Sequence, residues 1–134
     1  MTQTARDAER EVVEWLARVK VLPVLTVFDV RTVEATCRAL ADGGVSCVEI
    51  TYRTACAQEA IVRASQIPGL MVGAGTVVGA EQAGAAAQAG ARFAVAPGLS
   101  EPVVAAAREM QAARRARDRC LLRPQFPRIT LAAR

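Results

Sequence analysis

The stretch that decides the fold is GVSCVEITYRT, residues 44–54, in which a strand-like apolar run contains a single acid. Valine, cysteine and isoleucine dominate residues 45–51, and continuous apolar runs rich in β-branched side chains are typical of buried strands in parallel sheets. Glu49 interrupts this run, and Arg53 follows it four residues later. From this stretch alone two interpretations of Glu49 are open: an acid that is solvated or ion-paired at a strand end, and an acid that performs chemistry.

Three further stretches repeat the strand pattern, and they begin near residues 21, 70 and 92. Their sequences are VLPVLTV (21–27), LMVGAG (70–75) and RFAVAPG (92–98). Pro23 weakens the first of them, because proline cannot donate a hydrogen bond to a neighbouring strand. Strands that recur about every 20–25 residues indicate βαβ units on a parallel sheet.

Helices are predicted before, between and after these strands. Their expected starts are, in chain order, residue 4, Asp29, Thr54, Ala80 and Ser100. Asp29 and Thr54 are expected to cap their helices, because both side chains can accept a hydrogen bond from a free backbone N–H group of the first turn. Two architectures fit this order of elements: an open doubly wound sheet and a (β/α)8 barrel, of which four units form half.

The composition is that of a globular protein, with 52% hydrophobic residues and 22% charged residues in 134. No apolar run approaches the roughly 18 residues that cross a membrane, and the N-terminus has no signal-peptide core, so a cytoplasmic protein is expected. Histidine is absent, and the four cysteines form no C-x-x-C pair. The sequence therefore predicts buried reduced thiols, no metal site, and acid–base chemistry that falls to carboxylates, tyrosine or lysine.

The charge changes sign near Met110. Residues 1–109 carry twelve acids and ten bases, whereas residues 110–134 carry seven arginines against Asp118 alone. The strand–helix pattern also stops there, and no clear strand is expected in the tail. We therefore divide the chain into a domain over residues 1–109 and an arginine-rich tail over residues 110–134.

The alternation of side chains along residues 45–51 places Glu49 on the opposite face of the strand from Val48 and Ile50. In a barrel the helix-facing side is the more apolar, so Glu49 would point into the lumen near the C-terminal mouth, where barrel enzymes keep their active sites. Partial burial there would suit a general base or acid. The guanidinium group of Arg53, just past the strand, suits a carboxylate or phosphate, although a surface arginine or a partner of Glu49 is an equally simple interpretation.

The sequence GAGT, residues 73–76, ends the third strand with two glycines that permit close backbone approach to a ligand, next to the hydroxyl group of Thr76. Extended to Gly79, it gives G-x-G-x-x-x-G. The dinucleotide-binding motif has two residues between its second and third glycines, whereas this sequence has three. The motif also has an acid about 20 residues later, and here no acid lies between Glu81 and Glu101. A dinucleotide site is therefore a weak alternative.

The sequence resembles the bacterial 2-keto-3-deoxy-6-phosphogluconate aldolases, which also act as 4-hydroxy-2-oxoglutarate aldolases. The matching text is VLPVLTV, ALADGGVSCVEITYRTACAQEAI, VGAGTV and AGARFAVAPGLSEPVV, and it covers roughly residues 12–109. The resemblance implies a (β/α)8 barrel, a homotrimer, no metal or other cofactor, and cleavage of a keto acid to pyruvate through a lysine Schiff base. It also implies that Glu49 transfers protons and that Arg53 and Thr76 hold the pyruvate carboxylate.

The chain departs from this family in the Schiff-base lysine, which family members carry in the second half of the barrel. Lys20 is the only lysine here, and it precedes the first strand, at the N-terminal end of the barrel. We therefore expect a first half-barrel of four βα units plus an N-terminal helix, inactive alone, prone to self-association, and frameshifted or truncated near Met110. The alternative is a non-catalytic fragment whose basic tail binds nucleic acid or an acidic partner, against which the tail offers only one aromatic residue, Phe126.

Overall fold

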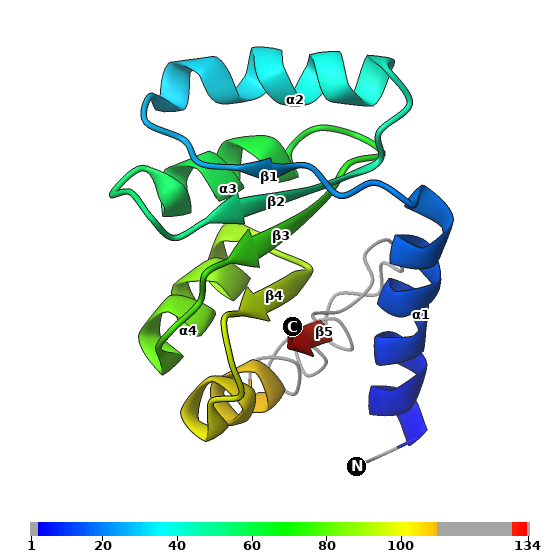
Figure 1. Cartoon of the computed structure of the whole chain (residues 1–134), viewed down its shortest axis with the longest axis vertical. Helices are drawn as coiled ribbons and strands as arrows, with labels where there is room; N and C mark the ends of the chain where they lie inside the picture. Colours follow the sequence, from blue (N-terminus) through cyan, green and yellow to red (C-terminus); the bar gives the residue numbers. More distant parts are fainter. Residues whose placement is uncertain (1–2, 110–129, 134) are drawn as a thin grey trace, which may run out of the picture.

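Five parallel strands form one sheet in the computed structural model, which describes residues 3–109 and 130–133 (Figure 1). The strands are β1 (Val24–Leu25), β2 (Cys47–Thr51), β3 (Met71–Gly75), β4 (Phe93–Ala96) and β5 (Thr130–Ala133). They lie in the order β1-β2-β3-β4-β5. A doubly wound sheet reverses its order at a switch point, whereas barrel strands follow one another in chain order. The observed order therefore selects the barrel, and the predicted half-barrel is confirmed.

The expectation of no strand in the tail is wrong, because β5 pairs with β4 from Phe93↔Thr130 to Ala96↔Ala133. The last strand of a half-barrel presents unpaired backbone groups along its open edge, and a short segment can add to them. The strand-like residues of β5 are few and follow a stretch rich in arginine and proline, which conceals their pattern. Residues 110–129, which carry six of the seven arginines of the tail, lie outside the described residues, and the boundary at residue 109 stays a prediction.

The helices follow the predicted order. They are α1 (Gln3–Val19), the short 3-10 helix η1 (Val30–Thr32), α2 (Val33–Asp42), α3 (Ala57–Ser65), α4 (Ala80–Ala89) and a helix over residues 101–109. The Asp29 cap is confirmed, because its side chain accepts a hydrogen bond from the N–H of Arg31 at 2.9 Å, although η1 precedes α2. The last predicted helix is confirmed as well, and its Val104 N–H donates to the carbonyl of Ser100 at 3.0 Å.

Two expected details are wrong. The strand expected over residues 21–27 is reduced to β1, although the Pro23 carbonyl still accepts a hydrogen bond from the N–H of Glu49 at 2.9 Å. Thr54 does not cap α3, which begins after Cys56 without a side-chain cap. The Thr54 hydroxyl instead donates to the carbonyl of Val27, so it ties the β2–α3 loop to the end of β1.

The two faces of the sheet bury different helices (Figure 1). On the outer face, Val48 and Ile50 of β2 pack with side chains of α2, α3 and α4 in the larger apolar cluster. On the inner face, α1 packs across the start of the strands. That smaller cluster contains Val12, Cys47, Met71 and Phe93, with Trp15, Leu16, Val19, Leu22 and Val95 packed against it. The inner cluster occupies the N-terminal ends of β2, β3 and β4, and it leaves their C-terminal ends for the site described below.

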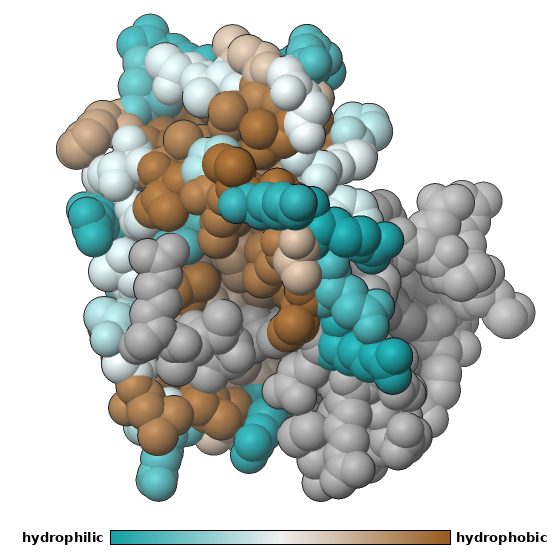
Figure 2. Space-filling model, turned by 45° about the vertical axis from the view of Figure 1, so that its right-hand side comes forward, coloured by the Kyte–Doolittle hydropathy of each residue, from teal (hydrophilic) through white to brown (hydrophobic). Residues whose placement is uncertain are grey.

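Apolar side chains also remain exposed near the open edge of the sheet. Val21 and Val24 are 62% and 48% exposed, and Phe28, just after β1, is 81% exposed. Figure 2, which brings the α1 side forward, shows hydrophobic residues gathered in the middle of this face beside hydrophilic ones. An edge strand with exposed apolar residues invites pairing with another chain. Of the helices that the structure describes, none has the length and apolar character needed to cross a membrane.

Candidate active site

Glu49 lies on the inner face of β2 and is almost completely buried, with 5% of its surface exposed. Its neighbours Val48 and Ile50 pack on the outer face against the helices. Strand alternation therefore orients Glu49 as predicted, toward the side that forms the lumen in a closed barrel. The candidate site therefore contains a carboxyl group that is shielded from bulk water.

Gly75, on the neighbouring strand β3, leaves the space that the Glu49 side chain fills. A Cβ atom on residue 75 would overlap Oε1 of Glu49 and would lie 2.7 Å from its Cδ and Cγ atoms. A Cβ atom on Gly73 would overlap the ring of Phe93 in the same way. The expectation that these glycines permit close approach of a ligand is corrected: side chains of this chain occupy both places.

Arg53 and Thr76 follow the ends of two adjacent strands. A hydrogen bond joins the N–H of Tyr52 to the carbonyl of Gly75 at 2.8 Å, and Arg53 and Thr76 each come one residue later. Thr76 has φ 56°, in the left-handed region that β-branched residues rarely adopt. Arg53 is exposed and Thr76 is half-buried. The structure thus brings both residues to the same edge of the sheet as Glu49, and their roles stay predictions.

Two threonine hydroxyl groups join this edge, and the sequence interpretation did not include them. The hydroxyl oxygens of Thr26 and Thr51 lie 2.9 Å apart, and the hydroxyl of Thr51 lies 3.3 Å from the carbonyl of Leu25. Thr51 shares a face with Glu49 by the alternation rule, so strand periodicity could have found it. The contact with Thr26 depends on the β1–β2 register, in which Val24 lies opposite Glu49.

Burial favours the neutral form of two ionisable side chains, one at the start of β2 and one just after its end. Desolvation is the larger and the nearby negative charge of Glu49 the smaller of two causes that raise the pKa of Cys47 to about 12. Burial also raises the pKa of Tyr52, whose hydroxyl group has no hydrogen-bond partner among the residues that the structure describes. Cys37 and Cys47 are buried free thiols as predicted, whereas Cys56 is half-buried and Cys120 lies outside the described residues.

Lys20 lies away from this edge, at the other end of the strands. It follows the last residue of α1, is exposed, and has φ 59°. Since α1 packs at the start of the strands, Lys20 belongs to the opposite end of the sheet from Arg53 and Thr76. Within residues 3–109 and 130–133, no three histidine, cysteine, aspartate or glutamate residues come together in a group that could hold a metal ion.

A sequence model of the family described as KDPG and KHG aldolase matches residues 12–114. Among curated proteins, the chain is 46% identical over 93 residues to a 2-dehydro-3-deoxy-phosphogluconate aldolase from Treponema pallidum. The aligned residues cover 69% of this chain and 44% of that protein. The chain is 43% identical over 90 residues to the KHG/KDPG aldolase of Escherichia coli K12, covering 66% and 42%. The chain therefore spans less than half the length of these relatives.

Solved structures give the same fold. A 2-keto-3-deoxy-6-phosphogluconate aldolase from Zymomonas mobilis, determined with 3-phosphoglycerate, superposes with a TM-score of 0.69 at 34% identity and covers 80% of this chain and 49% of that one. The KDPG aldolase of Legionella pneumophila, with pyruvate captured as a covalent carbinolamine intermediate, gives a TM-score of 0.61 at 31% identity, covering 66% and 43%. Both are barrel aldolases, and each match spans less than half of the solved chain.

Proposed function

This chain belongs to the KDPG and KHG aldolase family, and from that premise we propose that the C-terminal edge of its sheet binds the 2-oxo-acid part of an aldolase substrate. The full reaction proposed for the complete barrel is cleavage of 2-keto-3-deoxy-6-phosphogluconate to pyruvate and glyceraldehyde 3-phosphate, or of 4-hydroxy-2-oxoglutarate to pyruvate and glyoxylate. The observation that carries the proposal is the buried Glu49 carboxyl group at the edge where Arg53 and Thr76 follow adjacent strands.

Each of the three side chains suits one part of this task. The planar guanidinium group of Arg53 donates two parallel hydrogen bonds to a carboxylate, which fixes the orientation of a keto acid. The hydroxyl group of Thr76 supplies a further donor beside it. In a complete barrel that carries the lysine, the carboxyl group of Glu49, shielded from water, would transfer protons to and from the carbinolamine and the enamine.

The covalent step requires an amine that attacks the keto group and forms a Schiff base. Lys20 is the only lysine in the sequence, and it lies at the other end of the sheet. We therefore propose that this chain orients a 2-oxo acid without activating it covalently, and that by itself it does not catalyse the cleavage.

Pyruvate binding tests the proposed site. Saturation-transfer NMR should show pyruvate bound to the wild-type chain, and pyruvamide, which has no carboxylate, should bind at least tenfold more weakly because it cannot pair with Arg53. Arg53→Gln should remove the preference for the acid. Arg38→Gln, which changes an exposed arginine of α2, is the matched control and should bind as the wild type does.

Equal binding of pyruvate and pyruvamide, or an unchanged preference in Arg53→Gln, would show that this edge does not recognise the carboxylate. A chain that binds neither compound would refute the proposal as well. Circular dichroism of both variants at the same protein concentration separates a lost contact from a lost fold.

A further inference from the structure

Two threonine side chains share the inner face of the sheet with Glu49. Thr51 follows Glu49 by two residues on β2, so strand alternation gives both side chains the same face. Val24 of β1 lies opposite Glu49 in the register, and Thr26 follows Val24 by two residues. The hydroxyl oxygens of Thr26 and Thr51 lie 2.9 Å apart, in agreement with this placement.

This hydroxyl pair lies beside the Glu49 carboxyl group. Thr51 is the register partner of Gly75 on β3, and the Glu49 carboxyl group fills the space where Gly75 has no side chain. Neighbouring strands lie about 4.8 Å apart. A row across the C-terminal ends of three strands therefore runs from Thr26 through Thr51 to the carboxyl group.

The protons of the pair can be assigned from its contacts. A threonine hydroxyl group has one proton to donate and two lone pairs that accept. The hydroxyl group of Thr51 donates to the carbonyl of Leu25 at 3.3 Å, which uses its proton. The contact between the two hydroxyl groups then carries the proton of Thr26, which donates to the oxygen of Thr51. Thr26 retains only lone pairs, so toward a ligand it is an acceptor.

Thr26 is also the member of the pair that a ligand can reach. Thr51 is 1% exposed, whereas Thr26 is half-buried. Carboxylate and keto oxygens only accept hydrogen bonds, so neither can pair with an acceptor. A hydroxyl group can donate to it. The assignment of protons therefore selects a hydroxyl group as the ligand group at Thr26.

We propose that Thr26 is a specificity-determining residue of the candidate active site, which selects a 2-oxo acid with a hydroxyl group on C4. With the carboxylate of the acid at Arg53 and its keto group beside Glu49, the ligand extends along the row toward β1. There its C4 hydroxyl group donates to Thr26. Thr51 is a positioning residue, because it accepts the Thr26 proton and so keeps Thr26 an acceptor. The inference rests on the proposed binding of a 2-oxo acid at this edge and adds the residues that recognise the next part of the ligand.

Two acids that differ only in this hydroxyl group test the proposal, namely 4-hydroxy-2-oxoglutarate and 2-oxoglutarate. Their affinities for the chain are measured by ¹H–¹⁵N NMR titration. We expect the hydroxy acid to bind about threefold to tenfold more tightly, the contribution of one hydrogen bond. Thr26→Val keeps the shape of the side chain without its oxygen and should bind both acids equally, whereas Thr26→Ser should retain the preference.

The role of Thr51 has its own pair of variants. Thr51→Val removes the group that accepts the Thr26 proton, so the preference for the hydroxy acid should fall. Thr51→Ser restores that group and should restore the preference. A role in packing alone predicts the reverse order, because valine fills the space of threonine better than serine does.

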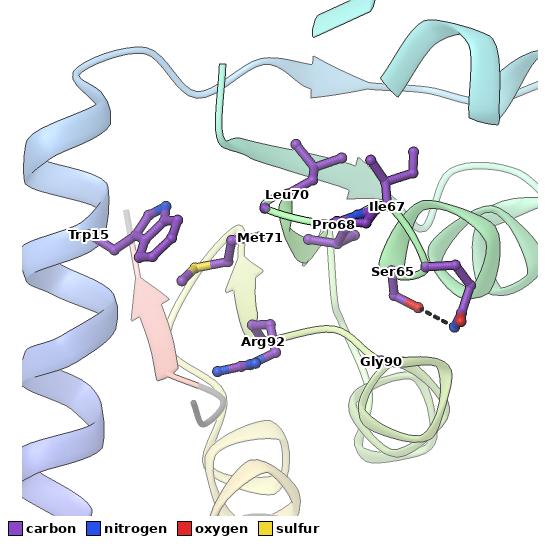
Figure 3. Close-up of a pocket in the computed structure, with 11 residues that line it drawn as sticks. Trp15, Ser65, Ile67, Pro68, Leu70, Met71, Gly90 and Arg92 are labelled. Carbon is purple, nitrogen blue, oxygen red and sulfur yellow. Dashed lines mark hydrogen bonds between the residues drawn. The ribbon is translucent and has the colours of Figure 1, made fainter. Parts of the chain in front are cut away.

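A cavity at the other end of the sheet is the competing place for these acids. It has a volume of about 510 Å³, and Trp15, Ser65 and Arg92 are among the residues that line it (Figure 3). Trp15 is the only tryptophan of the chain, so its indole N–H gives one signal that reports on this cavity. That signal should not follow the titrations. Ser65→Ala, which removes a hydroxyl group there, is the matched control and should keep the wild-type preference.

Equal affinities of the two acids for the wild-type chain would overturn the proposal, as would an unchanged preference in a folded Thr26→Val variant. An indole signal that saturates with either acid would overturn it as well, because the ligand would then occupy the cavity. If Thr26→Val fails to fold, the comparison of the two acids on the wild-type chain still decides the question. Pyruvate separates this inference from the proposed function. Equal affinities of the two acids in a chain that binds pyruvate would refute the role of Thr26 alone, whereas a chain that does not bind pyruvate would refute both.

Discussion

Replacing Gly75 with alanine should destabilise the chain because of Glu49 alone. Gly75 is not among the glycines with positive φ, so alanine suits its backbone, and only the new Cβ atom matters. That atom would overlap Oε1 of Glu49, a side chain that is 5% exposed and has little room to move. Overpacking a filled site costs about 1–3 kcal/mol, and the reduced freedom of the unfolded chain returns about 0.4–1 kcal/mol. We expect a net loss of about 1–2 kcal/mol in the free energy of unfolding.

A double-mutant cycle isolates this contact. In a Glu49→Ala background the carboxyl group is gone, so Gly75→Ala should become neutral or slightly stabilising, with a coupling energy of about 1–3 kcal/mol between the two positions. Urea unfolding, followed by circular dichroism at one fixed protein concentration, measures all four chains. Gly98→Ala is the control, because a Cβ atom there would meet nothing within 4 Å, and its effect should be the same in both backgrounds.

Equal destabilisation by Gly75→Ala in the wild-type and Glu49→Ala backgrounds would refute this reasoning. It would mean that the Glu49 side chain does not lie over β3, and that the inward orientation of the candidate catalytic carboxyl group is wrong.

Three further predictions concern stability and assembly. Because the folded pKa of Cys47 is raised to about 12, its contribution to stability is complete below the unfolded pKa of about 8.5 and is lost as the pH rises toward 12. Urea unfolding of Cys47→Ala should therefore depend less on pH over that range, and an identical dependence would contradict the burial. Thr76→Gly should stabilise the chain by up to about 1 kcal/mol, because relief of the left-handed backbone outweighs the added entropy of the unfolded chain, while it weakens pyruvate binding; a variant that binds pyruvate as well as wild type would exclude Thr76 from the site. We expect the wild-type chain to self-associate, and Val24→Lys should shift its sedimentation toward the monomer, because a charge on the exposed edge strand opposes pairing, whereas Val62→Lys on the exposed surface of α3 should not; equal behaviour of the two would refute pairing through this edge.

The orientation of Glu49 could be predicted because it depends on local rules. Strand periodicity fixes its face relative to Val48 and Ile50, and the apolar character of those neighbours identifies the helix-covered side. The repeat of strand and helix likewise predicted the parallel sheet. Periodicity does not encode the order of strands in a sheet, so it could not separate a barrel from a doubly wound sheet. The family resemblance implied the barrel, and the observed strand order agrees with it.

Contacts between distant segments could not be predicted from the same rules. The Thr54 hydroxyl donates to the carbonyl of Val27 rather than to its own helix, and that choice depends on the β1–β2 arrangement. The glycines of β3 make room for Glu49 and Phe93, which come from neighbouring strands. The packing of α1 across the start of the sheet could not be predicted either, because amphipathic spacing in α1 predicts burial without naming the surface that the helix covers.

The most direct test of the central claim is to reduce the chain with borohydride in the presence of saturating pyruvate and to measure its intact mass. We predict that pyruvate binds, as NMR of the same sample would show, and that the mass remains that of the unmodified chain, because the only lysine of the sequence lies away from the edge formed by Glu49, Arg53 and Thr76. A reduced pyruvate adduct on Lys20 would contradict the proposed site, since that lysine would then reach a keto acid that we place at the other end of the sheet.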